Sequence, residues 1–80
     1  MVKVLSVIPQ DNYQLHVKLS NGKEGLFDVT PYLERGIFVE LKDKAYFSTV
    51  KAIWGGVAWP RSQDFSADTL EFEMKALMRA

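Results

Sequence analysis

The first third of the chain alternates apolar and polar side chains at the spacing of β-strands. Val2–Ile8 is apolar on both alternating faces and is stopped by Pro9, which cannot donate to a sheet ladder. From Tyr13 to Leu19 apolar and polar residues alternate with a period of two, which predicts a half-buried strand. Asn21-Gly22 then favours a two-residue type I′ turn into a third strand from Lys23 to Val29. The predicted cross-strand pairs are Leu19 with Glu24, Val17 with Leu26, and His16 with Phe27.

Turn and capping signals dominate the middle of the chain. Thr30 and Pro31 favour the start of a short helical turn, which Gly36 is expected to end. Asp43 favours the start of another turn ahead of Tyr46. An apolar ridge between the two turns is formed by Ile37, Phe38 and Leu41.

The last third predicts a second hairpin and a C-terminal helix. Short β-prone runs at Val50–Ile53 and Val57–Trp59 flank the turn Trp54-Gly55-Gly56. A polar connection leads to Ser66, a good N-cap for a helix from Ala67 onward, and we expect Asp64 to accept backbone N–H groups there or to assist the cap. The buried stripe of this helix is predicted to be Leu70, Met74 and Leu77.

These elements predict one small α+β domain spanning residues 1–80. About five short strands form antiparallel β hairpins, packed with a short central helical segment and a C-terminal helix. With 48% apolar content and no linker or shift of composition, 80 residues can hold a single core. A domain of this size buries only about 60% of the surface that its unfolded chain exposes. We therefore expect marginal stability unless packing is good or a partner adds buried area.

Composition and charge exclude several classes of function. Ten Lys plus Arg balance ten Asp plus Glu, so the chain lacks the basic excess of a domain held on phosphates, and we expect no direct nucleic-acid binding. The absence of cysteine excludes disulfides and thiolate ligands. The first apolar run is too short for a signal peptide, and no stretch approaches the roughly 20 apolar residues of a membrane span. We therefore expect a cytoplasmic protein.

Few side chains in the sequence are candidates for catalysis or ligand binding. His16, the single histidine, falls on the polar side of its strand with no nucleophile spaced to use it, so we expect it to be solvated or stacked on Phe27. The glycine pair of the second hairpin lacks the further residues of a phosphate loop. The carboxylates of Asp28, Asp64 and Asp68 could act as oxygen ligands, but their spacing matches no recognised metal-binding motif. Structural roles are sufficient to explain their presence. We predict no catalytic residue, no metal site and no cofactor.

The residues best suited to contact a partner are Trp54, Trp59 and Arg61, because Trp and Arg are enriched at binding hot spots. Core packing is the alternative for both tryptophans, whereas Arg61 is the better surface candidate. Structural roles in turns and at the cap are predicted for Asn21, Gly22, Asp64 and Ser66.

Short motifs follow one another along nearly the whole chain: Leu19-Ser20-Asn21-Gly22, Asp28-Val29-Thr30-Pro31-Tyr32-Leu33, Gly36-Ile37-Phe38, Leu41, Phe47, and Trp59-Pro60 through Asp64-Phe65-Ser66-Ala67-Asp68-Thr69-Leu70. In this order they resemble the domain-of-unknown-function family 2442, whose members are small bacterial α+β proteins without established catalytic residues. Two positions depart from the family's pattern. Arg61-Ser62 stands where the family often has Asn-Gly, and Ala67 where it often has Pro.

The resemblance implies a protein that acts through a partner. Such proteins are often encoded beside another small protein in an arrangement like a toxin and antitoxin pair, and some longer relatives append a helix-turn-helix domain. We therefore expect a non-catalytic protein-interaction module, an antitoxin-like or regulatory accessory subunit of a small bacterial protein pair, which binds a protein partner or self-associates. The alternatives are an accessory domain of a DNA-bound transcriptional regulator and a small enzyme.

Overall fold

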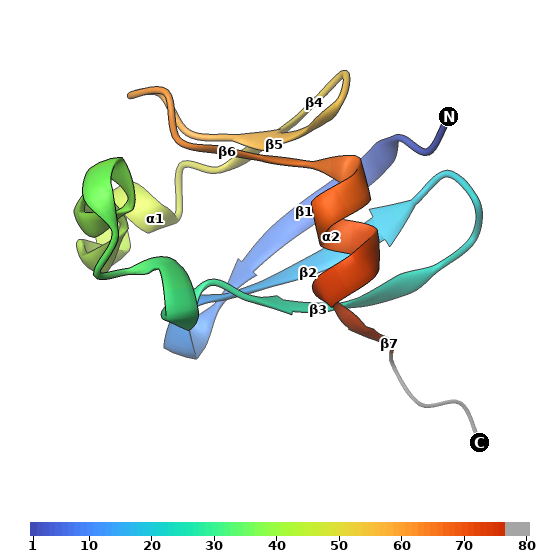
Figure 1. The fold of residues 1–80 in the computed structure, drawn as a ribbon. Helices are drawn as coiled ribbons and strands as arrows, with labels where there is room; N and C mark the ends of the chain where they lie inside the picture. Colours follow the sequence, from blue (N-terminus) through green and yellow to red (C-terminus); the bar gives the residue numbers. More distant parts are fainter. Residues whose placement is uncertain (77–80) are drawn as a thin grey trace.

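Two antiparallel sheets enclose the core of the protein (Figure 1). The computed structural model describes residues 1–76. One sheet has the strand order β1-β2-β3-β7, comprising Val4–Gln10, Gln14–Leu19, Glu24–Asp28 and Lys75–Ala76. The other has the order β4-β5-β6, comprising Lys51–Ile53, Gly56–Ala58 and Asp64–Ser66. Helix α2 (Ala67–Glu73) packs between them, against β2 of the first sheet and β5 and β6 of the second.

The predicted α+β class is confirmed, and the number of strands is higher than expected. Residues 1–76 hold six strands of three or more residues, and the two-residue β7 makes a seventh. Strand β6 lies where the sequence predicts a polar connection, so that prediction is wrong at Asp64–Ser66. Pairing of Phe65 with Val57 extends the second hairpin into a three-stranded sheet. Two polar residues flank Phe65 in this strand. The burial of Phe65 depends on contacts with distant parts of the chain.

The β2–β3 hairpin differs from its prediction by one residue in register. Its pairs are Lys18 with Glu24, Val17 with Gly25, His16 with Leu26 and Leu15 with Phe27. The loop consists of Ser20, Asn21 and Gly22: the Gly22 N–H donates to the Leu19 carbonyl, and the Leu19 N–H to the Lys23 carbonyl. Gly22, with φ of 91°, takes the left-handed conformation that completes a type I turn with a bulge. The predicted type I′ turn is wrong because Asn21 stays out of the left-handed region while its side chain accepts the Lys23 N–H.

The apolar face of β2 lies at the centre of the core. Leu15, Val17 and Leu19 are fully buried, as the alternation of this strand predicts. They share the core with the fully buried side chains Phe27, Val29, Leu41, Val57 and Leu70. Each such side chain contributes about 1.5 to 3 kcal/mol relative to an exposed one.

Short helical segments connect the two sheets. They are the 3₁₀ helices η2 (Thr30–Tyr32) and η3 (Gly36–Lys42) and the helix α1 (Lys44–Phe47). Asp43 caps α1 as predicted, because its carboxylate accepts the N–H groups of Ala45 and Tyr46. Gly36 begins η3, with φ of 45°, so its predicted role as a stop is wrong. The predicted apolar ridge is only partly buried, since Leu41 is buried, Phe38 is half-buried and Ile37 is exposed.

Helix α2 begins where the sequence predicts and ends earlier. The Ser66 hydroxyl accepts the Thr69 N–H at 3.1 Å, which makes Ser66 the N-cap. The helix ends at Glu73, and Met74 has the extended angles φ −71° and ψ 150°. The predicted helical stripe is therefore wrong at Met74, and Leu77 lies outside the described residues. Early termination lets Lys75–Ala76 pair with β3 at the edge of the first sheet.

Candidate interaction surface

The three residues proposed for partner contact lie in different surroundings. Trp59 is buried, with 3% of its surface exposed. Its indole N–H donates to the Phe47 carbonyl at 2.8 Å, and its ring contacts the rings of Phe47 and Phe65. Trp59 is thus a core residue, which leaves Arg61 and Trp54 as surface candidates.

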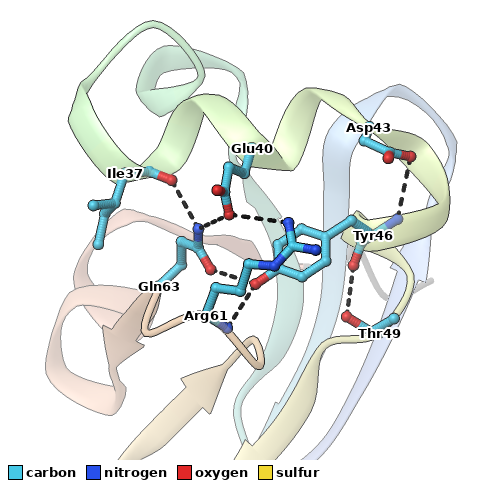
Figure 2. Close-up of polar contacts among 7 residues, drawn as sticks. All are labelled: Ile37, Glu40, Asp43, Tyr46, Thr49, Arg61 and Gln63. Atoms are coloured by element: carbon cyan, nitrogen blue, oxygen red, sulfur yellow. Dashed lines mark hydrogen bonds and ion pairs between the residues drawn. The ribbon is translucent and has the colours of Figure 1, made fainter.

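Arg61 lies in a tight turn that joins β5 to β6 (Figure 2). The Trp59 N–H donates to the Gln63 carbonyl at 2.9 Å, and the Ser62 N–H donates to the Trp59 carbonyl at 3.3 Å. Ser62 has φ of 82°, a left-handed backbone conformation that residues other than glycine rarely adopt. This turn repeats the hydrogen-bond pattern of the β2–β3 loop, with Ser62 in the position that Gly22 occupies there.

A buried amide fixes this turn to the helical segments. Gln63 is 1% exposed; its Nε2 donates to the Ile37 carbonyl at 2.8 Å and to Glu40 Oε1 at 3.2 Å. Its Oε1 accepts the Tyr46 hydroxyl at 2.6 Å, and that hydroxyl oxygen accepts the Arg61 N–H at 2.8 Å (Figure 2). Buried polar groups require such partners, so the network holds the turn in one conformation. Nothing in the local pattern around Gln63 distinguishes it from a solvated loop residue.

The side chain of Arg61 is already partly engaged. Its Nη1 lies 3.4 Å from Glu40 Oε1, and its guanidinium carbon lies 4.9 Å from the centre of the Tyr46 ring. The side chain remains 67% exposed. Exposed ion pairs contribute about 0 to 1 kcal/mol, so a partner carboxylate would compete with Glu40 at little cost.

Trp54 lies in the turn between β4 and β5, and 74% of its surface is exposed. The Lys3 ammonium lies 3.7 Å from the centre of its ring, a cation–π contact. The neighbouring Gly55 carbonyl accepts the Ala67 N–H at 2.7 Å, which ties the tip to the start of α2. Lys3 itself is fixed by its backbone N–H, which donates to Ser20 Oγ at 2.9 Å. The exposed indole is therefore presented by a hairpin that is held on two sides.

Each of the two neighbouring strands, β4 and β1, also carries an exposed apolar side chain. Ile53 precedes Trp54 in β4, and Leu5 lies in β1, at the register shift between Val4 and Ser6. Strand β1 lies beside β4, and β4 pairs only with β5 within residues 1–76. We call this region the Trp54 surface, made by Lys3, Leu5, Lys51, Ile53 and Trp54. Of these residues, only Trp54 was predicted from the sequence. The available signal was that Lys51-Ala52-Ile53 has only Ala52 on the side that could face a core.

Among the remaining candidate residues, His16 and Asp28 have structural partners. His16 Nε2 lies 2.6 Å from Glu24 Oε2 on the outer face of the first sheet, with both side chains half-buried. His16 faces Leu26 across the strands, which corrects the predicted pairing with Phe27. The Asp28 carboxylate accepts the Thr30 N–H at 3.0 Å, and Asp68 lies in the first turn of α2. Within residues 1–76, no three His, Asp or Glu residues gather as a metal ion requires.

Asp64 lies away from the helix cap that it was expected to support. It sits in β6 opposite Ala58 with an exposed side chain. Its carboxylate accepts no hydrogen bond from the described part of the chain, and the cap of α2 is made by Ser66. Asn21 and Gly22 do hold the β2–β3 loop, through the Asn21 side chain and the left-handed Gly22.

Two ionisable groups join α2 to the rest of the fold and have shifted pKa values. The Tyr32 hydroxyl donates to both Glu73 oxygens, at 2.7 and 2.8 Å; this hydrogen bonding, then burial and the nearby negative charge, raise the pKa of Tyr32. Hydrogen bonds from Lys23 and from Asn21 lower the pKa of the Glu71 carboxyl. Both contacts reach the helix from the first half of the chain.

The fold and this surface define a small two-sheet α+β domain with a rigidly presented aromatic tip. The family model described as "Protein of unknown function (DUF2442)" matches residues 4–76, and the chain belongs to that family. The resemblance inferred from the motifs is thereby confirmed. A search of curated proteins and a search of solved structures each found no match. Among the residues that the structure describes, no helix has the length and apolar character of a membrane span.

Proposed function

We propose that this protein is a non-catalytic protein-interaction module, an antitoxin-like or regulatory accessory subunit of a small cytoplasmic protein pair in a bacterium. Trp54 is the anchor of the interaction. The observation that carries this proposal is the 74% exposed indole on a hairpin held by Lys3 on one side and by Ala67 on the other.

Binding through such a tip is physically favourable for two reasons. Covering apolar surface gains roughly 25 cal/mol per Å², and an aromatic side chain offers about 150 to 250 Å². The cation–π contact and the Gly55–Ala67 hydrogen bond already order the tip, so little further conformational entropy is lost when a partner covers it. Exposed aromatic anchors on rigid elements are typical of interface hot spots.

Arg61 has a supporting role in this proposal. Its guanidinium is already in contact with Glu40 and the Tyr46 ring, so an additional contact replaces an existing one. Trp59 has no role in partner binding in this proposal, because it is buried in the core.

Affinity purification of the tagged chain from its native host tests the proposal. We expect the wild-type chain and a Phe72→Ala control to retain the same partner, and Trp54→Ala to lose it. Phe72 is a matched control because it is also an exposed aromatic residue, on α2. Equal melting temperatures for the three proteins would show that folding is unaffected. Recovery of the partner by Trp54→Ala, or of no partner by the wild type, would contradict the proposal.

A further inference from the structure

We infer that the Trp54 surface binds an acidic segment of its protein partner, a segment that combines Asp or Glu with apolar side chains. This inference rests on the proposed function and adds the chemistry of the partner. The partner's carboxylates lie against Lys3 and Lys51, and its apolar side chains cover Ile53 and Trp54.

The centre of the surface is apolar. Leu5, Ile53 and Trp54 are 61%, 45% and 74% exposed, and they lie on two strands that run beside each other. Lys51 and Ile53 alternate with Ala52 along β4, so their side chains point to the same face of the second sheet. A segment laid along this face meets Lys51 and Ile53 before it reaches the turn that carries Trp54.

The charged groups of this surface are of one sign. Four ion pairs occur within residues 1–76, and they use His16, Lys23, Lys42 and Arg61. Neither Lys3 nor Lys51 takes part in one of these pairs. In the second sheet, Lys51 pairs with Ala58 and Ala58 pairs with Asp64, so the backbone of Asp64 lies two strands away, roughly 10 Å. The chain as a whole has a net charge of zero, so these two lysines do not reflect an overall positive charge of the protein.

The Lys3 ammonium can contact the Trp54 ring and a carboxylate of the bound segment at the same time. Its ammonium lies over one face of the Trp54 ring, and it carries three N–H donors. A carboxylate can accept from this ammonium while the cation–π contact persists. The lysines would thus orient the segment and speed its association, whereas the apolar side chains would supply most of the affinity.

The charge pattern favours an acidic protein segment over a second copy or a nucleic acid. A two-fold symmetric contact would bring the same surface from both copies together, and Lys3 and Lys51 would then face like charges. A nucleic acid is held by many phosphate contacts, and this surface offers two lysines beside aliphatic side chains.

Selection of random twelve-residue peptides displayed on phage, with the whole chain as bait, tests this chemistry. We expect the selected peptides to be enriched in Asp and Glu together with apolar residues. The dissociation constant of the best peptide should rise at least tenfold for the Lys3→Glu/Lys51→Glu variant and should also rise with added salt. A Lys18→Glu/Lys44→Glu control makes the same change in net charge at two exposed lysines elsewhere and should change that constant less than twofold.

Several results would overturn the inference. They are the absence of acidic enrichment, an equal loss of affinity in the control variant, tighter binding of a poly-dT oligonucleotide than of the selected peptide, and dimerisation through Trp54 in sedimentation. Far-UV circular dichroism and melting temperatures would establish that each variant is folded. If the native partner is lost by Trp54→Ala and retained by Lys3→Glu/Lys51→Glu, the inference fails while the proposed function stands. If Trp54→Ala retains the partner, the proposed function itself fails.

Discussion

At the scale of single residues, Ser62 shows the clearest conflict between residue type and conformation. It occupies the left-handed position of a turn whose counterpart in the β2–β3 loop is Gly22. The left-handed conformation costs a non-glycine residue about 1 to 2 kcal/mol, whereas glycine adopts it freely.

We therefore predict that Ser62→Gly stabilises the protein by about 0.5 to 1 kcal/mol, because relief of strain exceeds the added entropy of the unfolded chain. The shift in the urea midpoint at constant m-value measures this change. Gly22→Ala is the matched control and should destabilise by a similar amount, since alanine is strained at φ of 91°. A midpoint for Ser62→Gly at or below that of the wild type would show that strain at Ser62 is compensated elsewhere.

Residue-level features were only partly predictable from the sequence. Trp54 follows one short β-prone run and Trp59 ends the other, and the same alternative of core or surface applied to each. Their burial is decided by distant elements, because Trp59 is covered by Phe47 and Phe65 while Trp54 occupies the turn itself. The role of Gln63 depends on Tyr46 and η3, which no local pattern connects to it.

At the scale of secondary-structure elements, α2 depends on its cap and on one buried side chain. Ser66 accepts the Thr69 N–H, and Leu70 is fully buried between the two sheets. We predict that Ser66→Ala costs about 0.5 to 2 kcal/mol and Leu70→Ala about 2 to 5 kcal/mol. Met74→Ala should cost less than Leu70→Ala, since Met74 is half-buried and outside the helix. Urea denaturation of the three variants tests the order, and unchanged midpoints for Ser66→Ala and Leu70→Ala would mean that α2 is not docked.

Elements defined by contacts between residues close in the sequence were mostly predicted correctly, whereas those defined by contacts between distant residues were not. The alternation of β2 and the caps at Asp43 and Ser66 are local signals, and both kinds of prediction were confirmed. The register of the β2–β3 hairpin depends on which loop residues adopt the left-handed conformation. Asn-Gly is compatible both with a type I′ turn and with the observed type I turn followed by a bulge. The end of α2 is set by the pairing of β7 with β3, about 50 residues earlier in the chain, and helix periodicity does not contain that information.

At the scale of the whole molecule, two contacts of α2 make stability depend on pH at both ends of the range. The Glu71 carboxyl has a lowered pKa in the fold, so its contribution is present above the ordinary value of 4.5 and is lost as the pH falls through the folded value. Tyr32 has a raised pKa, so its contribution is complete below the ordinary value of 10.0 and is lost as the pH rises through the folded value.

We predict a plateau of melting temperature near neutral pH that falls on both sides. Glu71→Gln should flatten the acid side, and Tyr32→Phe should flatten the alkaline side, each with little effect on the other. Melting curves between pH 3 and 11 for the wild type and both variants measure this. An acid side that is unchanged in Glu71→Gln would mean that other carboxylates control the loss of stability.

Small size connects stability to binding at this scale. An 80-residue domain has limited core, and a partner that binds only the folded chain adds about 2.7 kcal/mol when its concentration is a hundred times its dissociation constant. For a domain of this length, that corresponds to a rise in melting temperature on the order of 10 to 20 °C. We predict this rise when the native partner is added in such excess, and no rise for Trp54→Ala.

The melting temperature of the isolated chain should be independent of its own concentration, because the like charges of Lys3 and Lys51 oppose pairing of two copies through the Trp54 surface. A melting temperature that increases with the concentration of the chain alone would point to self-association instead.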